Sequence, residues 1–154
     1  MGEALWDVLP DGKKIGGAPA NFAYHVSQFG LPSAVVSAVG DDALGHELVE
    51  NLTSKGLTHL LETVPYATGT VQVEIDQAGI PQYEIKENVA WDNIPYTARL
   101  EALASRTRAV CFGSLAQRNV VTRNTINRFL DAMPQTADTL VVFDVNLRQG
   151  FYNK

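Results

Sequence analysis

The sequence predicts an α/β protein with a doubly wound, mostly parallel sheet and a small antiparallel β segment. Short apolar strand patterns alternate with helical patterns along most of the 154 residues, and apolar strands between helices are typical of a parallel sheet covered on both faces. One stretch, residues 68–86, instead has the alternating pattern of a half-exposed hairpin. The length fits one domain with a sizeable core.

The first half of the chain alternates between helix and strand. Residues 21–29 place apolar side chains at helical spacing, and residues 33–40, "SAVVSAVG", form a short β-branched run. Asp41 or Asp42 can cap a second helix whose leucines share one face, and Gly56 can end that helix. The following "LTHLLETV" predicts another strand.

The hairpin pattern begins with "TGTVQVEI", in which Val71, Val73 and Ile75 alternate with polar neighbours. Residues 76–79 predict the turn, and "PQYEIKE" predicts the returning strand. Such a hairpin on an α/β body often closes as a lid over the carboxyl edge of the sheet, where ligands bind in open α/β folds. We expect this lid to occupy about residues 66–92.

Regular alternation returns after the hairpin. The patterns predict a helix over 97–107, an apolar strand over 109–113, a helix near 120–133 and a strand over 139–146. No internal repeat and no low-complexity linker interrupts the sequence.

Charge and composition exclude several classes of protein. The formal net charge is −5 and no Lys/Arg cluster occurs, which argues against binding to nucleic acid or to an anionic membrane. Cys111 is the single cysteine, so no intrachain disulfide is possible, and a buried thiol in a reducing compartment is expected. The N-terminus lacks the pattern of a signal peptide, and we therefore expect a cytoplasmic protein.

No metal or hydrolase motif is present in the sequence. The three histidines, His25, His46 and His59, show no metal-ligand spacing with carboxylates or with the cysteine. There is no defensible Ser-His-Asp arrangement, no Walker phosphate loop and no GxGxxG after a strand. We predict no metal site in this chain.

The stretch "GGAPAN" at residues 16–21 is the first candidate site. Gly16 and Gly17 lack Cβ atoms, so a polar ligand can approach the peptide plane, and the Asn21 amide offers both a donor and an acceptor. That pairing suits vicinal hydroxyls. The alternative is an ordinary turn ahead of a capped helix, since Gly, Pro and Asn are common turn residues.

Two further segments carry polar groups at strand positions. Asp7, in "LWDVLP", is a carboxylate that can accept from two hydroxyls at once, although an exposed edge aspartate is an equal alternative. In "FDVNLRQG", Asp144, Asn146 and Arg148 share one side of an extended chain and could face a ligand or a phosphate. Taken alone, that pattern also fits a solvated strand end.

Together these segments resemble the ribokinase-like (PfkB) carbohydrate kinases, and within them the fructokinases. The N-terminal signature of that family is a glycine pair, a small residue or proline, an asparagine and two further glycines at set distances. Residues 16–23, "GGAPANFA", with Gly30 and Gly40, fill every position. Supporting matches are "GEALWDVLP", "VGDDALG", "TGTVQV", "AWDNI" and "DVNLR". The resemblance runs from Gly2 to about Tyr152.

The resemblance implies roles for individual residues. It implies that the sugar hydroxyls are held by Asp7, Gly16, Gly17 and Asn21. It also implies that the lid contacts the sugar through Lys86 and Trp91, and that the pocket floor is lined by Gly113 and Ser114. Asn146 and Arg148 would lie nearer the phosphates of ATP, where the Arg148 guanidinium can stabilise the transferring charge.

Two departures from the family limit what this chain can do. Members normally begin with a buried strand before "GE", and they carry a Gly-Ala-Gly-Asp element that is absent here. That element supplies the aspartate base and the anion hole for the phosphoryl group, and the adenine pocket lies in the same half. Residues 1–154 therefore match the N-terminal, sugar-binding part, with the nucleotide-binding half absent and no catalytic base. We expect the isolated chain to be inactive and prone to aggregation.

The expected reaction is transfer of the γ-phosphoryl group of ATP, as its Mg²⁺ complex, to a primary hydroxyl of fructose. Other acceptors consistent with the family are ribose, a nucleoside or a ketodeoxy acid. The alternative from another class is a non-catalytic sugar-binding module that dimerises through the exposed lid hairpin.

Overall fold

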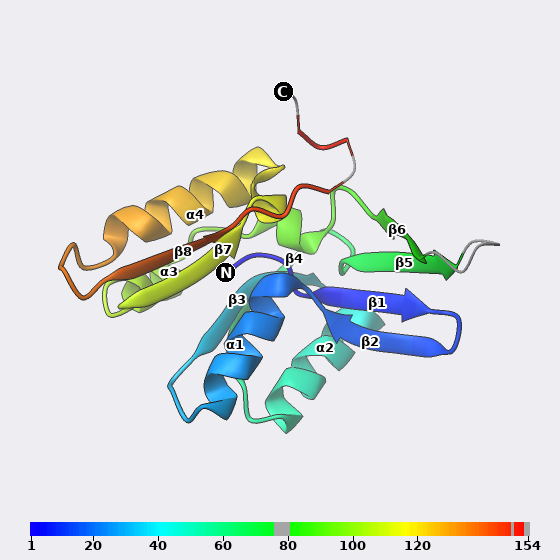
Figure 1. The fold of residues 1–154 in the computed structure, drawn as a ribbon, viewed down its shortest axis with the longest axis horizontal. Coiled ribbons are helices and arrows are strands. Elements are labelled where there is room, and N and C mark those ends of the chain that lie inside the picture. Colours follow the sequence, from blue (N-terminus) through cyan, green and yellow to red (C-terminus); the bar gives the residue numbers. More distant parts are fainter. Residues whose placement is uncertain (76–80, 149, 153–154) are drawn as a thin grey trace.

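The computed structural model describes residues 1–75, 81–148 and 150–152 (Figure 1). Its strands are β1 (Leu5–Leu9), β2 (Gly12–Gly16), β3 (Ala34–Gly40), β4 (Thr58–Val64), β5 (Thr70–Ile75), β6 (Pro81–Ile85), β7 (Ala109–Gly113) and β8 (Leu140–Asp144). Its helices are α1 (Ala18–Gln28), α2 (Ala43–Ser54), α3 (Ala98–Ala104) and α4 (Val120–Ala132), with the short 3₁₀ helices η1 (Ala90–Asn93) and η2 (Leu115–Gln117).

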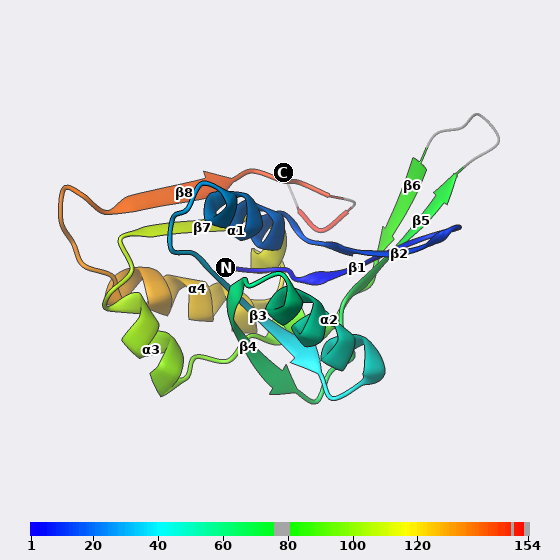
Figure 2. The same ribbon diagram turned by 90° about the horizontal axis from the view of Figure 1, so that it is seen from below.

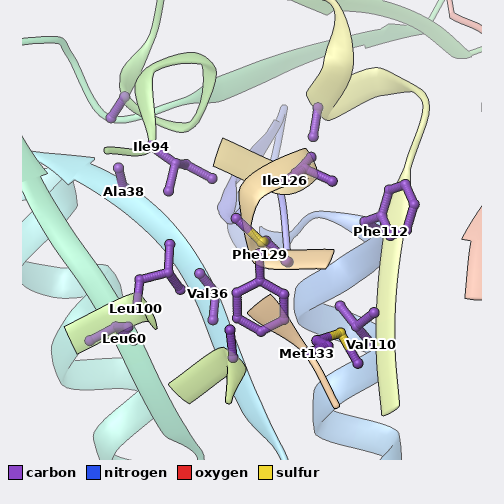
Figure 3. Packing of buried hydrophobic residues seen from close by; sticks show 14 of the residues in the cluster. Val36, Ala38, Leu60, Ile94, Leu100, Val110, Phe112, Ile126, Phe129 and Met133 are labelled. Carbon is purple, nitrogen blue, oxygen red and sulfur yellow. The ribbon is translucent and has the colours of Figure 1, made fainter. Parts of the chain in front are cut away.

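Helices cover both faces of strand β3, which confirms the predicted α/β class. Val35 and Val39 face a core formed with α1, α2 and Trp6 of β1. Val36 and Ala38 face the opposite way, into a core that includes side chains of α3, α4, β4 and β7 (Figure 3). Because alternate residues of one strand are buried on opposite sides, the body has the two helical layers of a doubly wound fold.

The described strands form three sheets, of which two are parallel pairs: β3 with β4, and β7 with β8. The N-terminal residues lie between these pairs (Figure 2). The Gly2 N–H donates to the Val36 carbonyl at 3.0 Å, and the Met1 amino group donates to the Cys111 carbonyl at 2.7 Å. Residues 1 and 2 thus connect the two parallel pairs through hydrogen bonds.

The third sheet, which we call the small sheet, has the strand order β2-β1-β5-β6 and extends away from the body (Figure 2). Its β5–β6 pair is antiparallel, which confirms the predicted hairpin, while the turn predicted at 76–79 lies outside the described residues. Strand β1 runs parallel to β5 and antiparallel to β2. The predicted lid therefore gains two strands from the N-terminal region.

Among the predicted boundaries that differ from the structure are those of α1, β8 and α3. The first helix begins at Ala18 rather than at residue 21, because Gly17 is its N-cap and Pro19 fits the first helical turn. The last strand ends at Asp144 rather than at 146, since the Asn146 N–H turns back to the Asp144 carbonyl at 3.1 Å. Helix α3 ends at Ala104 instead of 107.

Candidate functional site

The Asp7 carboxylate lies directly over Gly16. Asp7 is on β1 and Gly16 ends the antiparallel partner β2, where an added Cβ would overlap the Asp7 carboxylate. The Asp7 side chain is half-buried and has no hydrogen-bond or ion-pair partner among the described residues. Burial raises the pKa of this carboxyl above its ordinary value. The site therefore presents a partly desolvated carboxylate whose acceptor positions are open to a ligand.

Gly17 joins this carboxylate site to helix α1. Its φ of +102° favours glycine, and an added Cβ would overlap the Glu3 carbonyl. The Gly17 carbonyl accepts the Asn21 N–H at 3.0 Å, which closes the first turn of the helix. The Asn21 side chain is exposed and makes no hydrogen bond to any described residue. Asp7, Gly16 and Gly17 thus lie where β2 enters α1, and Asn21 lies in the first turn of that helix.

A cavity of about 680 Å³ lies where strand β6 leaves the small sheet. Its described lining residues come from the end of β6, from η1, and from the segments around Arg118 and Phe151: Glu84, Ile85, Lys86, Glu87, Asn88, Asp92, Arg118, Asn119, Gly150 and Phe151. The Lys86 ammonium pairs with Glu84 at 2.7 Å and remains about half exposed. The structure therefore places Lys86 on the wall of a cavity, as a lid contact would require.

A second cavity of about 290 Å³ adjoins the first and shares Arg118 and Phe151 with it. Ser114 lines this second cavity at the end of β7. The Ser114 N–H donates to the Asp144 carbonyl at 2.9 Å, and its hydroxyl accepts the Asn146 N–H at 2.8 Å. Both predicted strand ends, β7 and β8, are thus fastened to one serine.

Asn146 and Arg148 are close to each other, as the sequence predicts, but neither lines the two cavities. The Arg148 Nε donates to the Asn146 Oδ1 at 2.6 Å, and Arg148 is exposed. Gly113 is buried beside Asp144, with the Asp144 carbonyl 3.5 Å from the position of an added Cβ. These strand-end residues form the second half of the candidate site.

The two halves of the site adjoin through Gly2. A Cβ on Gly2 would lie 3.0 Å from Pro19 of α1 and 3.0 Å from Ala116 of η2. The start of α1, which follows the glycine pair, therefore packs next to the turn that follows Ser114. The glycine pair and the predicted pocket floor therefore belong to segments whose next elements, α1 and η2, are neighbours in space.

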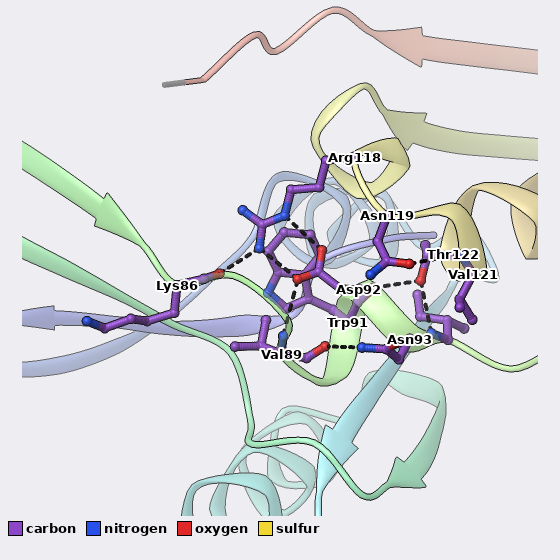
Figure 4. A network of polar contacts seen from close by, with 10 residues as sticks. Lys86, Val89, Trp91, Asp92, Asn93, Arg118, Asn119, Val121 and Thr122 are labelled. Carbon is purple, nitrogen blue, oxygen red and sulfur yellow. Dashed lines mark hydrogen bonds and ion pairs between the residues drawn. The ribbon is translucent and has the colours of Figure 1, made fainter. Parts of the chain in front are cut away.

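The sequence does not single out Arg118, which lines both cavities and bonds to Asp92 and to the Lys86 carbonyl (Figure 4). Its Nε and Nη2 donate to the two Asp92 oxygens at 2.8 Å each, and Nη2 also donates to the Lys86 carbonyl at 2.6 Å. Asp92 belongs to the "AWDNI" segment quoted for the family resemblance, which is the one signal that could have led to the pair. Arg118 itself follows no local pattern.

Trp91 was predicted as a lid residue that closes over the sugar. In the structure its side chain is fully buried, next to Leu5 and Val71 of the small sheet and Leu115 of η2. The Arg118 guanidinium stacks on the indole at 4.2 Å from the ring centroid. Trp91 thus packs against Arg118, which lines both cavities, while Trp91 itself lines neither. Its direct contact with a sugar stays a prediction.

Glu3 is a buried carboxyl close to this region. It is 2% exposed, and its Oε2 has no hydrogen-bond partner among the described residues. Burial raises the pKa of the Glu3 carboxyl, which favours its neutral form. The part of Glu3 that lies against Gly17 is its main-chain carbonyl rather than this carboxyl.

The described residues show neither a metal-binding cluster nor a membrane-spanning helix. They contain no group of three or more His, Cys, Asp or Glu side chains that could hold a metal ion. None of the helices in this part of the chain is long and apolar enough to cross a membrane.

Comparison with solved structures identifies the fold as ribokinase-like. An uncharacterized sugar kinase of Pyrococcus horikoshii superposes with a TM-score of 0.80 at 30% identity, covering 96% of this chain and 52% of that one. The apo fructokinase of Vibrio cholerae O395 superposes with a TM-score of 0.81 at 26% identity, covering 100% of this chain and 55% of that one. The class defined is therefore a ribokinase-like α/β protein.

The chain belongs to the pfkB family of carbohydrate kinases, whose model matches residues 11–149. Among curated relatives, the Pyrococcus horikoshii sugar kinase is 31% identical over 146 residues, 94% of this chain and 46% of that protein. An ATP-dependent 6-phosphofructokinase of Thermoanaerobacterium thermosaccharolyticum is 30% identical over 143 residues, 92% of this chain and 44% of that protein. A fructokinase of Rhizobium leguminosarum bv. trifolii is 26% identical over 159 residues, which are 97% of this chain and 48% of that protein. The chain spans about half the length of these relatives.

Proposed function

We propose that the protein carrying this chain phosphorylates a primary hydroxyl of fructose with ATP, and that residues 1–154 supply the sugar-binding side. The observation that carries this proposal is the Asp7 carboxylate, half-buried and without a partner among the described residues, held over a glycine. A carboxylate in that state can accept hydrogen bonds from two hydroxyls of one sugar. Membership of the pfkB family supports the reaction class.

The other candidate residues complete the acceptor site. Asn21 offers an exposed amide beside the glycine pair, so it can donate to one hydroxyl and accept from another. Lys86 lines the larger cavity, and Ser114 lines the smaller cavity that adjoins it. Holding the acceptor in one orientation contributes to catalysis because it removes translational and rotational freedom before the reaction.

The exposed guanidinium of Arg148 fits the phosphates of ATP. Its Nε is bonded to Asn146, while its remaining N–H groups have no partner among the described residues. When bound with Mg²⁺, ATP supplies the phosphoryl group, and Arg148 would stabilise negative charge on its oxygens. One solved neighbour, the Pyrococcus horikoshii sugar kinase, is described in complex with ATP. No residue of this chain is assigned to the metal ion.

The proposal is tested with a coupled assay for fructose-dependent ADP formation on the complete gene product that contains these residues. Asp7→Asn should lower kcat/KM for fructose by about a hundredfold, because a hydrogen-bonded charged acceptor is lost. The matched control is Asp11→Asn, an exposed aspartate in the turn between β1 and β2, which should leave the rate unchanged. Equal activity of wild type and Asp7→Asn contradicts the proposal.

A different acceptor is the second candidate, because one relative is named as an ATP-dependent 6-phosphofructokinase. The same assay with fructose, fructose 6-phosphate, ribose, a nucleoside and a ketodeoxy acid separates the candidates. Fructose should give the largest kcat/KM. A preference for any other acceptor replaces fructose in the proposal and leaves the phosphoryl transfer intact.

Dimerisation through the small sheet is a further part of the proposal. Strand β6 pairs with β5 alone among the described strands, so one edge of the small sheet is available for pairing with a second copy. Sedimentation analysis of the complete gene product should give the mass of a dimer. Sugar binding without turnover in that product would favour the non-catalytic module instead. A cytoplasmic location stays a prediction of the sequence.

A further inference from the structure

Arg118 connects the small sheet to the body of the protein. It follows η2 in the body, and it grips the Asp92 carboxylate of η1 with two N–H groups (Figure 4). Its Nη2 also donates to the carbonyl of Lys86, the residue that follows β6. The Lys86 N–H in turn donates to the Thr70 carbonyl at the start of β5, at 3.3 Å. One guanidinium therefore bonds the residue that follows β6, and that residue in turn bonds the start of β5.

Two aromatic rings contact the guanidinium. Arg118 lies 4.2 Å from the ring centroid of Trp91 and 4.5 Å from that of Phe151, and its side chain is 6% exposed. Trp91 occupies the space that a side chain on Gly69 would need, directly before β5. The Trp91 carbonyl accepts the Thr122 hydroxyl of α4 at 2.9 Å. The Arg118 plane is thus fixed relative to both the body and the small sheet.

Stability alone does not explain a buried charged pair of this kind. Removing two charges from water costs about as much as their attraction returns, and an apolar pair of the same volume is often equally stable. What a bidentate arginine contributes is a fixed geometry between the two elements that it joins. In addition, the Arg118 Nη1 is buried without a partner among the described residues, on a side chain that lines both cavities.

We propose that Arg118 is a positioning residue that holds the small sheet in place over the acceptor pocket. The inference rests on the proposed function, because it takes the two cavities as part of the sugar site. Arg118 acts through Lys86 and Asp92, and it fixes the base of the lid relative to the second cavity, which Ser114 lines.

The test compares Arg118→Met, Arg118→Lys, Asp92→Asn and the Arg118→Met/Asp92→Asn double variant of the complete gene product. Amide hydrogen exchange of β5, β6 and Lys86 is measured without sugar, and kcat and KM are measured with fructose. Arg118→Met should raise exchange in these strands about tenfold and raise KM about tenfold, with little change in kcat. Arg118→Lys should give exchange rates and a KM between those of Arg118→Met and wild type, because lysine keeps the charge and loses the bidentate geometry.

The double variant separates positioning from stability. It removes both charges, so its urea midpoint should recover relative to either single variant, while exchange and KM stay raised. Recovery of all three readouts overturns the inference and makes the pair merely structural. Arg99→Met is the matched control, an exposed arginine on α3 with no partner among the described residues, and it should change nothing.

The two hypotheses fail in different ways. If the wild type does not phosphorylate fructose, the proposed function is wrong, and hydrogen exchange in the small sheet still decides the role of Arg118. If the wild type is active and exchange is the same in wild type and Arg118→Met, the inference about Arg118 is wrong and the proposed function stands.

Discussion

At the scale of single residues, the site depends on an aspartate that has been partly removed from water. Burial raises the pKa of Asp7, so its ionised form becomes dominant at a higher pH than for an exposed aspartate. The unpaired carboxylate contributes nothing favourable to folding while it is charged. Its contribution to stability is largest below the ordinary pKa of about 3.9, and it is lost as the pH rises through the raised value.

Asp7 therefore predicts a pH dependence of sugar binding. The ionised carboxylate is the form that accepts two hydroxyl hydrogen bonds, so fructose affinity should fall by up to about tenfold per pH unit below the raised pKa. Calorimetric titration of the complete gene product with fructose across the acid range measures this. In Asp7→Asn the affinity should be low and independent of pH over that range; an unchanged pH profile would remove Asp7 from the site.

The backbone conformation of Gly17 predicts a loss of stability when it is replaced, and Gly30 provides the matched control. A side chain at Gly17 would be strained at φ +102° and would overlap the Glu3 carbonyl, so Gly17→Ala should lower the free energy of unfolding by about 3 kcal/mol. Gly30→Ala also has positive φ but meets open space, and it should cost about 1 kcal/mol. Urea unfolding of both variants gives the difference, and equal losses would show that the contact with Glu3 does not matter.

At the scale of elements, Asp42 connects helix α2 to the entry of strand β5. Its carboxylate accepts the Gly45 N–H at 2.7 Å as the N-cap of α2. It also accepts the Thr68 N–H at 2.8 Å and the Thr68 hydroxyl at 2.7 Å. Burial would raise the pKa of Asp42, but the hydrogen bonds from Thr68 and Gly45 outweigh it and lower the pKa. One side chain thus caps a helix and orders the segment that leads into the small sheet.

Asp42→Ala should therefore cost more than the loss of a simple cap. We expect a loss of about 2 kcal/mol, against about 1 kcal/mol for Asn119→Ala, in which the α4 cap to the Val121 N–H is removed. Because the folded pKa of Asp42 is lowered, its stabilisation is present above the ordinary pKa and is lost as the pH falls through the lowered one. Urea midpoints at neutral and strongly acidic pH measure both effects; a constant difference between them would contradict this account.

The sequence predicts elements well where apolar side chains repeat with a clear period. The hairpin residues of β5 and the leucines of α2 are examples, and both lie where expected. Strand β2, "GKKIG", has no such period and was missed, since its extended form depends on pairing with β1 rather than on its own residues.

The sequence predicts only part of the candidate site, because only part of it follows a local pattern. Gly16, Gly17 and Asp7 are close in sequence, so a local pattern could relate them. Arg118 and Asp92 are 26 positions apart, and their pairing follows from the packing of η1 against the body. Only a folded chain shows that contact, because neither residue has an unusual local pattern.

At the scale of the whole molecule, strand β8 and the segment after it leave a row of apolar side chains in contact with solvent. Leu140, Val141, Phe143, Val145 and Leu147 are each at least half exposed. Exposed apolar groups gathered on one strand favour association with another surface. The isolated 154-residue chain should therefore associate as its concentration rises.

This association is tested by light scattering of the isolated chain. Leu140→Lys/Val141→Lys should reduce it, since the two lysines replace exposed apolar groups of β8. Phe29→Lys/Leu31→Lys makes the same change of charge on exposed apolar residues at another surface and should have a smaller effect. Equal effects of the two pairs would show that net charge, rather than the β8 surface, controls association.

The parallel pairing of β1 with β5 has a consequence for synthesis of the chain on the ribosome. The first hairpin ends at Gly16, whereas its parallel partner begins at Thr70, 54 residues later. At about 5–20 residues per second, the edge of β1 stays unpaired for roughly 3–11 s before the first residue of that partner is synthesised. During this interval the nascent hairpin exposes a row of unpaired backbone groups, and a chaperone that binds early in translation would find its target there.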